Sequence, residues 1–172
     1  QDIGVLSSLG IKEIKVYKST GKVSELQSSI DQNPVNGNTG IAHTRWATHG
    51  LVNEKNAHPH TNTTSDIVVV HNGIIENYTQ LKTELDKKGY KFYSDTDTEV
   101  IAQLIDHYKK KDLVTAVKKA LKRIEGSYAL AVMSIDEPDR IILARHRSPL
   151  VIGLANNELF FASDINPFLN YT

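Results

Sequence analysis

Short runs of alternating or continuous apolar residues predict strands before and after a helical middle part of the chain. Residues 13–17 (Glu-Ile-Lys-Val-Tyr) alternate between polar and apolar side chains, which is typical of a half-buried strand. Residues 67–70 (Ile-Val-Val-Val) form a continuous β-branched run, which indicates a buried strand. The pattern predicts strands at residues 4–8, 13–17, 41–45, 66–71, 91–93, 128–135, 141–145, 151–154 and 159–162. A turn around Gly10 would join the first two in a hairpin.

The middle of the chain changes to helical periodicity. Apolar residues recur at the spacing of one helix face, at Val100, Ile101, Leu104, Ile105 and Tyr108. The same reasoning predicts helices over residues 23–30, 77–88, 97–110 and 112–124. Asn77 is placed to cap the second helix and Gly89 to follow its last turn.

The order of these elements predicts the fold class. Strands come first, helices follow, and strands return, which indicates an α+β layered domain rather than a parallel βαβ array. The last four strands predict one antiparallel meander. Residues 31–39 read as a loop. Residues 50–65 read as a long functional loop, because they show no periodicity and are rich in Asn, His and Thr.

Composition excludes several classes of function. Lysine plus arginine equals aspartate plus glutamate, at 20 each, so no net field attracts nucleic acid or an anionic membrane. No apolar run approaches the roughly 20 residues that span a bilayer, and the first residues do not resemble a signal peptide. We therefore expect a cytoplasmic protein. The chain has no cysteine, which excludes disulfides, thiolate metal sites and a cysteine nucleophile within these 172 residues.

Polar residues that carry chemistry concentrate in residues 40–77. Arg45 offers a planar fork that matches a carboxylate, Thr48 and His49 add short-range hydrogen-bonding groups, and Gly50 permits close backbone approach. Together they could hold the α-carboxylate of an amino acid. An ordinary salt bridge at the end of a strand is the alternative for Arg45.

Asn72 and Gly73 follow the buried apolar run. A side-chain amide and an adjacent backbone N–H can converge on one point, as an oxyanion hole for acyl transfer requires. The competing interpretation is a simple turn, because Asn-Gly is a frequent turn dipeptide.

Asp95 and Asp97 precede the third predicted helix. A carboxylate there is stabilised by the helix dipole and can cap the helix, which either residue could do. The functional alternative is that one of them accepts hydrogen bonds from a substrate ammonium group.

Five histidines fall in the same stretch, at His43, His49, His58, His60 and His71. His58 and His60 have a spacing seen among metal ligands, but no carboxylate lies close in sequence and no HExxH helix exists. We expect these side chains to pack and form hydrogen bonds, with no metal.

Four motifs together resemble one family. They are His43-Thr-Arg-Trp-Ala-Thr-His-Gly50, Asn56-Ala-His-Pro-His60, His71-Asn-Gly-Ile-Ile-Glu-Asn77 and Asp95-Thr-Asp-Thr-Glu-Val100. In this order they resemble the glutaminase domain of glutamine–fructose-6-phosphate aminotransferases (isomerising), which are class II glutamine amidotransferases. Residues 148–153 and 161–164 continue the likeness, which covers nearly the whole chain from about Gly4.

The resemblance implies a fold and a site. It implies a four-layer αββα N-terminal-nucleophile hydrolase fold with two stacked antiparallel sheets, and hydrolysis of the glutamine side-chain amide to glutamate and ammonia without a cofactor. The site residues that it implies are Arg45, Thr48 and His49 for the α-carboxylate, Asp97 for the α-ammonium group, Asn72 and Gly73 for the oxyanion hole, and Trp46 for a loop that closes over glutamine. The implied partners are an isomerase domain of the same polypeptide, which binds fructose 6-phosphate, and a second copy in a homodimer.

Two departures from the family pattern set further expectations. The family's nucleophile is an N-terminal cysteine with its own α-amino group as base, and this chain has no cysteine. We expect residues 1–172 to form one type 2 amidotransferase domain without its first strand, its nucleophile segment or the isomerase domain, and to hydrolyse no glutamine alone. The alternatives are a catalytically silent glutamine-binding or interaction module, and a class II amidotransferase with a phosphoribosyl or aspartyl acceptor.

Overall fold

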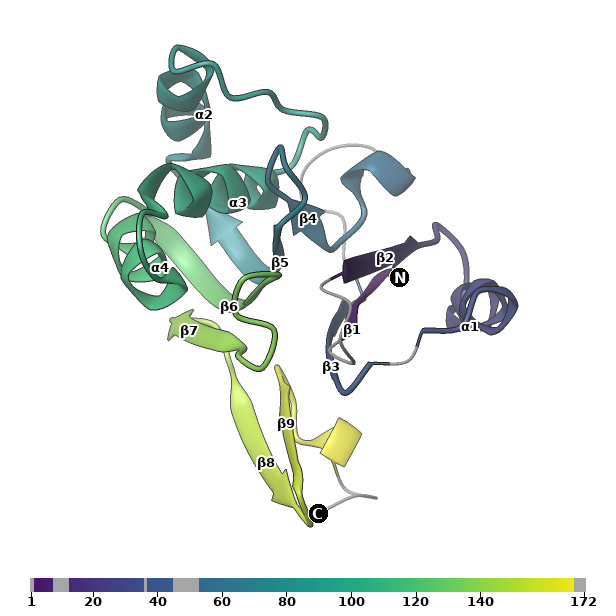
Figure 1. Ribbon diagram of the computed structural model, residues 1–172. Helices are drawn as coiled ribbons and strands as arrows, with labels where there is room; N and C mark the ends of the chain where they lie inside the picture. Colours follow the sequence, from purple (N-terminus) through teal and green to yellow (C-terminus); the bar gives the residue numbers. More distant parts are fainter. Residues whose placement is uncertain (1, 8–12, 36, 45–52, 169–172) are drawn as a thin grey trace.

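Two antiparallel sheets face each other in the computed structural model, which describes residues 2–7, 13–35, 37–44 and 53–168 (Figure 1). The smaller sheet has the order β2-β1-β3 and the larger has the order β4-β5-β6-β7. Their strands are β1 (Asp2–Ser7), β2 (Glu13–Lys18), β3 (Thr39–His43), β4 (His60–Thr61), β5 (Ile67–Ile75), β6 (Gly126–Ser134) and β7 (Ile142–His146). The predicted antiparallel pairing of the first two strands is confirmed by β1 and β2, and the predicted turn around Gly10 lies outside the described residues.

Helices cover the outer faces of the two sheets. The helices are α1 (Val23–Gln32), α2 (Tyr78–Asp86), α3 (Asp97–Tyr108) and α4 (Leu113–Leu121). In Figure 1 the last three lie on the side of the larger sheet that faces away from β1–β3, and α1 lies beyond the smaller sheet. The expected α+β class and αββα layering are therefore confirmed.

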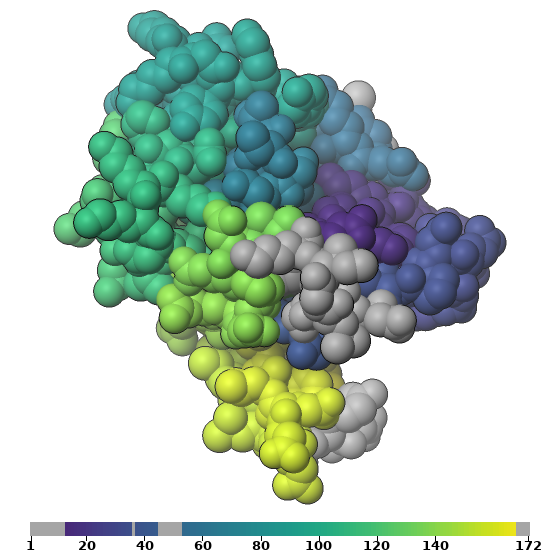
Figure 2. Space-filling model, in the orientation of Figure 1, coloured from purple at the N-terminus to yellow at the C-terminus, as the bar shows by residue number. Residues whose placement is uncertain are grey.

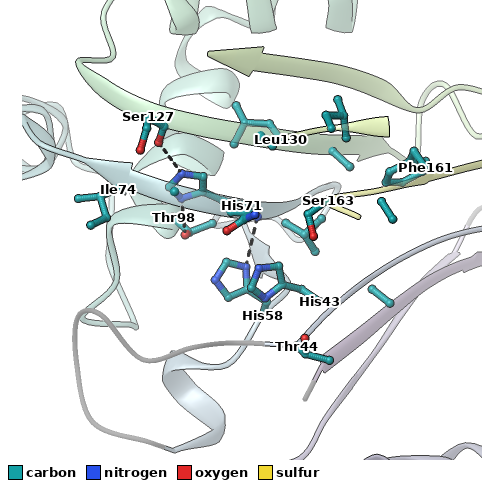
Figure 3. Close-up of a pocket in the computed structure, with 18 of the residues that line it drawn as sticks. His43, Thr44, His58, His71, Ile74, Thr98, Ser127, Leu130, Phe161 and Ser163 are labelled. Carbon is teal, nitrogen blue, oxygen red and sulfur yellow. Dashed lines mark hydrogen bonds between the residues drawn. The ribbon is translucent and has the colours of Figure 1, made fainter. Parts of the chain in front are cut away.

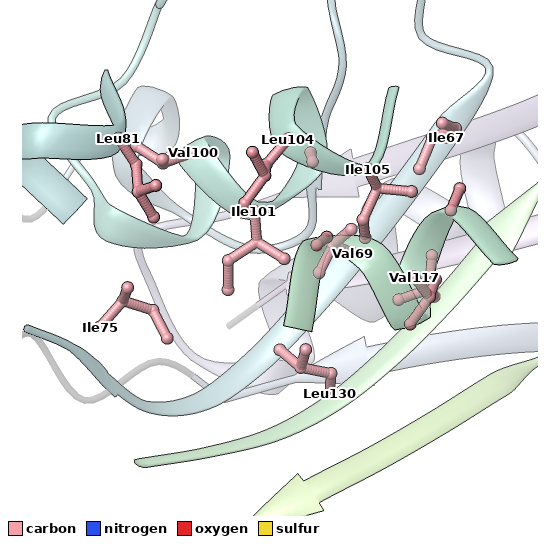
Figure 4. Close-up of a cluster of buried hydrophobic side chains, with 14 of the residues drawn as sticks. Ile67, Val69, Ile75, Leu81, Val100, Ile101, Leu104, Ile105, Val117 and Leu130 are labelled. Carbon is pink, nitrogen blue, oxygen red and sulfur yellow. The ribbon is translucent and has the colours of Figure 1, made fainter. Parts of the chain in front are cut away.

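The continuous apolar run of β5 is explained by burial on both faces. Ile67 and Val69 pack with α3 and α4 in the larger core cluster, where Ile101, Leu104 and Leu130 also lie (Figure 4). The alternate residues Val68 and Val70 point the other way. They pack against Ile41 of β3 and Met133 of β6, between the two sheets. Burying each such aliphatic side chain contributes about 1.5–3 kcal/mol, so β5 anchors both layers.

The predicted meander of four strands is wrong. Within the described part of the chain, β7 pairs with β6, whereas β8 (Val151–Ala155) and β9 (Glu158–Ala162) form a separate two-stranded ribbon. Figure 2 shows this ribbon, in yellow, projecting from the rest of the molecule. Leu154 and Leu159 on the ribbon are 72% and 69% exposed. Turn signals and alternation predicted each strand correctly but not which sheet it joins.

Two other predicted features, a strand at residues 91–93 and a loop without regular structure before residue 66, differ in the structure. Residues 91–93 are not a strand, because the carboxylate of Glu99 accepts from the backbone N–H groups of Tyr93 (2.8 Å) and Ser94 (2.6 Å). The loop before β5 contains a 3₁₀ turn, η1 (Glu54–Asn56), and the short strand β4. A second 3₁₀ turn, η2 (Asn166–Phe168), follows β9.

Both ends of α2 lie near the residues predicted for them, but the N-terminal residue Asn77 does not form the predicted side-chain cap. Asn77 is the N-cap residue, yet its side chain makes no capping bond. Its amide instead donates to the carbonyl of Arg123 (2.8 Å) and accepts from the N–H of Glu125 (3.1 Å). Gly89 has a φ of +90°, as expected for a residue that ends a helix. Among the described residues, no helix is both long and apolar enough to cross a membrane.

Glu99→Ala is expected to lower the free energy of unfolding by about 2–4 kcal/mol, because two backbone N–H groups and the Ser94 hydroxyl lose a buried acceptor. Chemical denaturation measures this loss. Glu84→Ala is the control and should change the free energy of unfolding much less, because the ion pair of Glu84 with Arg123 lies at the surface, where solvent screens it. Equal losses in the two variants would contradict the structural role of Glu99.

Candidate active site

A cavity of about 600 Å³ opens where the two sheets meet the first turn of α3 (Figure 3). Its walls come from β3, β5, β6, the start of α3 and the segment around β9. The volume lies within the range of roughly 300–1,000 Å³ that small-molecule sites occupy. Three of the predicted glutamine-binding and oxyanion residues line it: Asn72, Gly73 and Asp97.

Asn72 and Gly73 do not form a turn. Strand β5 continues through them to Ile75, with Gly73 opposite Tyr128 of β6. The φ of Gly73 is +147°, and a Cβ atom there would lie 2.1 Å from the carbonyl oxygen of Ser127. Only glycine fits this position, because any side chain would overlap backbone. Asn72 is exposed to the cavity that both residues line.

The two candidate aspartates have opposite environments. The side chain of Asp97 is only 7% exposed, and its Oδ2 accepts a 2.8 Å hydrogen bond from the N–H of Ile75. The side chain of Asp95 is 58% exposed and its Oδ1 lies 3.5 Å from Nζ of Lys55. Neither aspartate caps α3, because Thr96 occupies the N-cap and accepts from the N–H of Glu99 (3.4 Å). Of the two, only Asp97 lines the cavity.

His71 is buried beside these groups and joins three elements. Its Nδ1 lies 3.1 Å from Oγ1 of Thr98 on α3, and its Nε2 lies 3.3 Å from the carbonyl oxygen of Ser127 on β6 (Figure 3). Its Nδ1 is also 3.9 Å from Oδ2 of Asp97. Burial lowers the pKa of His71, although the carboxylate of Asp97 and the Ser127 carbonyl act in the opposite direction. The imidazole is therefore neutral at pH 7.

The other described histidines of this region pack against one another, as expected. His43 and His58 stack with ring centroids 4.1 Å apart, and His58 meets His60 edge-on at 5.0 Å. Nδ1 of His58 accepts from the N–H of His71 (3.4 Å), and Nε2 of His60 lies 3.1 Å from Oγ1 of Thr96. Within the described residues, no group of three or more His, Cys, Asp or Glu side chains is arranged to hold a metal ion.

The remaining predicted site residues lie outside the part of the chain that the structure describes. These residues are Arg45, Trp46, Thr48 and His49. Thr44, which directly precedes them, lines the cavity. Sequence reasoning did not single out Thr98 or Ser127, and it considered His71 only as a packing group or metal ligand. A polar residue that directly follows a run of four β-branched residues was the available signal for His71.

Comparison with known proteins identifies the family. A family model described as a glutamine amidotransferase domain matches residues 43–170. The chain belongs to this family. The structure of this glutamine amidotransferase domain is similar to the glutamine phosphoribosylpyrophosphate amidotransferase of B. subtilis in complex with ADP and GMP. That likeness has a TM-score of 0.80 and 28% identity, and it covers 97% of this chain and 36% of the other. A structure described as the allosteric regulatory enzyme of purine biosynthesis gives a TM-score of 0.82 at 28% identity, over 98% of this chain and 37% of that one.

Relatives with higher identity carry a different name. The domain is 50% identical, over 160 residues, to the glutamine–fructose-6-phosphate aminotransferase (isomerizing) of Clostridium acetobutylicum, covering 93% of this chain and 26% of the relative. It is 52% identical over 162 residues to the enzyme of that name from Pyrococcus horikoshii, covering 93% of this chain and 27% of the relative. The chain thus spans about a quarter of the length of these relatives.

Proposed function

We propose that this amidotransferase domain binds and hydrolyses glutamine within a longer glutamine–fructose-6-phosphate aminotransferase. The observation that carries the proposal is the single cavity that brings Asn72, Gly73 and Asp97 together from β5 and α3. The cavity offers a buried carboxylate, from Asp97, and amide groups, from Asn72 and Gly73. That arrangement suits an amino acid whose side chain carries a reactive amide. Identities near 50% to enzymes of that name support fructose 6-phosphate as the acceptor of the ammonia.

Each site residue has a chemical role in this proposal. Asp97 binds the α-ammonium group of glutamine, and its own position is fixed by the N–H of Ile75. Arg45, with Thr48 and His49, binds the α-carboxylate, and Trp46 belongs to the loop that closes over the substrate. The side-chain amide of Asn72 and the backbone N–H of Gly73 donate to the oxyanion that forms when the amide carbon is attacked.

The nucleophile in the proposal is a cysteine outside these 172 residues. Its thiolate attacks the side-chain carbonyl carbon, and the proton of the thiol passes through the α-amino group of that cysteine to the leaving nitrogen. The C–N bond breaks, ammonia leaves, and a thioester remains, which water hydrolyses to glutamate. The domain therefore comprises residues 1–172 together with that nucleophile segment. No step requires a cofactor.

The ammonia is consumed elsewhere in the same polypeptide. We place an isomerase domain there, which binds fructose 6-phosphate and converts it to glucosamine 6-phosphate, and we propose that the whole enzyme is a homodimer. The alternative acceptor is phosphoribosyl pyrophosphate, because the similar solved structures include an amidotransferase with that name. Their 28% identity, against about 50% for the aminotransferases, favours fructose 6-phosphate.

The test is an assay of the complete polypeptide. Glutamate release from glutamine, coupled to glucosamine 6-phosphate formation when fructose 6-phosphate is added, supports the proposal. Ammonia transfer to phosphoribosyl pyrophosphate instead would overturn the acceptor. Glutamine binding without glutamate release would show a silent module and overturn the hydrolysis.

Asp97→Asn is expected to raise the glutamine KM by at least about 30-fold, because losing one partner of a desolvated charge pair costs about 2–5 kcal/mol. The asparagine can still accept from the N–H of Ile75, so the fold is retained. Initial rates over a range of glutamine concentrations measure the change. Asp95→Asn is the matched control and should leave KM within about twofold, since its carboxylate is exposed. Equal effects in the two variants would remove Asp97 from the ammonium site.

A further inference from the structure

The hydrogen bonds of His71 determine which of its nitrogens carries the proton. The carbonyl oxygen of Ser127 can only accept, so Nε2 of His71 must carry a hydrogen and donate to it. In a neutral ring Nδ1 is then an acceptor, and the hydroxyl of Thr98 donates to it across 3.1 Å. The same hydroxyl oxygen lies 3.4 Å from Oδ1 of Asp97. Since a hydroxyl has one hydrogen, Thr98 donates to His71 only while the imidazole is neutral.

The groups around the ring favour that neutral state. From α3, the charged group that faces it is Asp97, with Nδ1 to Oδ2 at 3.9 Å. From β6, the ring meets the uncharged carbonyl of Ser127. From the segment before β4, His58 accepts from the backbone N–H of His71 and not from its ring. Burial outweighs the attraction of Asp97 and lowers the pKa of His71. Among the residues that the structure describes, the carboxylate of Asp97 therefore has no buried cation beside it at pH 7.

We propose that His71 is a positioning residue for Asp97, whose neutral imidazole fixes the first turn of α3 against β5 and β6 and leaves the Asp97 carboxylate uncompensated for the substrate ammonium group. The inference rests on the proposed function, because it assumes that Asp97 binds that group. Gly73 makes the arrangement possible. A Cβ atom at residue 73 would lie 2.9 Å from Nε2 of His71 and would overlap the Ser127 carbonyl to which Nε2 donates.

Protonation of His71 at acidic pH changes the hydrogen bonds between His71, Thr98 and Asp97. When His71 is protonated, Nδ1 becomes a donor and Thr98 can no longer donate to it. The hydroxyl then turns to Oδ1 of Asp97, and a positive charge lies 3.9 Å from Oδ2. That charge competes with the ammonium group of glutamine. Because the pKa of His71 is lowered, the competition begins only below the ordinary histidine pKa of about 6.5. By reciprocity, glutamine binding disfavours protonation of His71.

The test measures the glutamine KM of the complete polypeptide between pH 7.5 and about 5, a range that spans the ordinary histidine pKa. We expect the wild-type KM to rise as the pH falls below about 6.5, with kcat changing less. His71→Gln and His71→Asn carry neutral amides at every pH, so their KM should be flat over the same range. At pH 7.5 their KM should exceed that of the wild type by about tenfold, from one lost or misplaced hydrogen bond.

Two further variants separate positioning from a merely structural role. Thr98→Val removes the hydroxyl at nearly constant size and should raise KM at pH 7.5 by about tenfold, whereas Thr98→Ser should recover most of that loss. His107→Gln is the control for other histidines, because His107 lies in the last turn of α3 and also has a pKa lowered by burial. It should retain the acid rise in KM.

The outcomes distinguish the two proposals. Normal glutamine hydrolysis with the same acid rise of KM in His71→Gln and His71→Asn would overturn the role of His71 alone. Reduced thermal stability of these variants, with a KM equal to that of the wild type at every pH, would also overturn the role of His71 alone. Absence of glutamine hydrolysis by the wild type at any pH would overturn the proposed function and this inference with it.

Discussion

Gly73→Ala is expected to destabilise the domain by about 2–6 kcal/mol and to lower kcat for glutamine hydrolysis by at least about a hundredfold. The φ of +147° is costly for any residue with a side chain. The added Cβ would also lie 2.1 Å from the oxygen and 2.7 Å from the carbon of the Ser127 carbonyl. These are backbone atoms of a paired strand, so they cannot rotate away. The two strands must separate where Gly73 faces Tyr128, which displaces the oxyanion donors and the acceptor of His71.

Gly89→Ala is the matched control for this substitution. Gly89 also has a positive φ, of +90°, but a Cβ there would meet nothing within 4 Å. Its replacement carries only the conformational cost, about 1–2 kcal/mol, and leaves kcat unchanged. Chemical denaturation gives the stability of each variant, and initial rates of glutamate release give kcat. If the two glycine variants proved equally stable and active, the close approach of Ser127 would not be a constraint on the site.

Local pattern predicted most elements of this domain. The β-branched run at residues 67–70 is buried on both faces in β5, and the five apolar positions of the third predicted helix pack into the core with α4 and β5. Such features depend on neighbours a few residues away, which a single sequence displays. The order of strands, helices and strands then limits the possible layering.

Features that depend on distant partners were not predictable from local pattern. Asn-Gly reads as a turn until β6 pairs with it and extends β5 to Ile75. Residues 91–93 read as a strand until the carboxylate of Glu99 takes the N–H of Tyr93. At the first place pairing with a distant strand overrides local preference, and at the second a side-chain hydrogen bond from six residues along the chain does so.

The candidate site also combines features that the sequence predicts with features that depend on distant partners. Residue types in the sequence left Asp95 and Asp97 equivalent, and the family resemblance favoured Asp97. The structure separates them physically, because Asp97 is buried against the N–H of Ile75 while Asp95 is exposed beside Lys55. The position of His71 between Thr98 and Ser127 has no local signature, since its two partners come from separate elements. Buried polar groups of this kind become visible only once the layers are assembled.

Asn72→Ala is expected to lower kcat for glutamine hydrolysis by about 10²–10³-fold while changing the glutamine KM by less than about threefold. The side-chain amide would donate to the oxyanion only after attack on the carbonyl carbon, so its loss raises the energy of the transition state and not that of the bound substrate. Asn72 is exposed to the cavity and packs into neither core cluster, so truncating it should leave the fold intact.

Asn77→Ala provides the contrast for Asn72→Ala. The Asn77 amide bonds to the backbone of Arg123 and Glu125, away from the cavity. Its loss should lower the free energy of unfolding by about 1–3 kcal/mol and leave kcat unchanged. Steady-state kinetics and denaturation of both variants, in the complete polypeptide, separate the two roles. A rise in KM at constant kcat for Asn72→Ala would assign its amide to ground-state binding of glutamine, and the oxyanion would then require another donor.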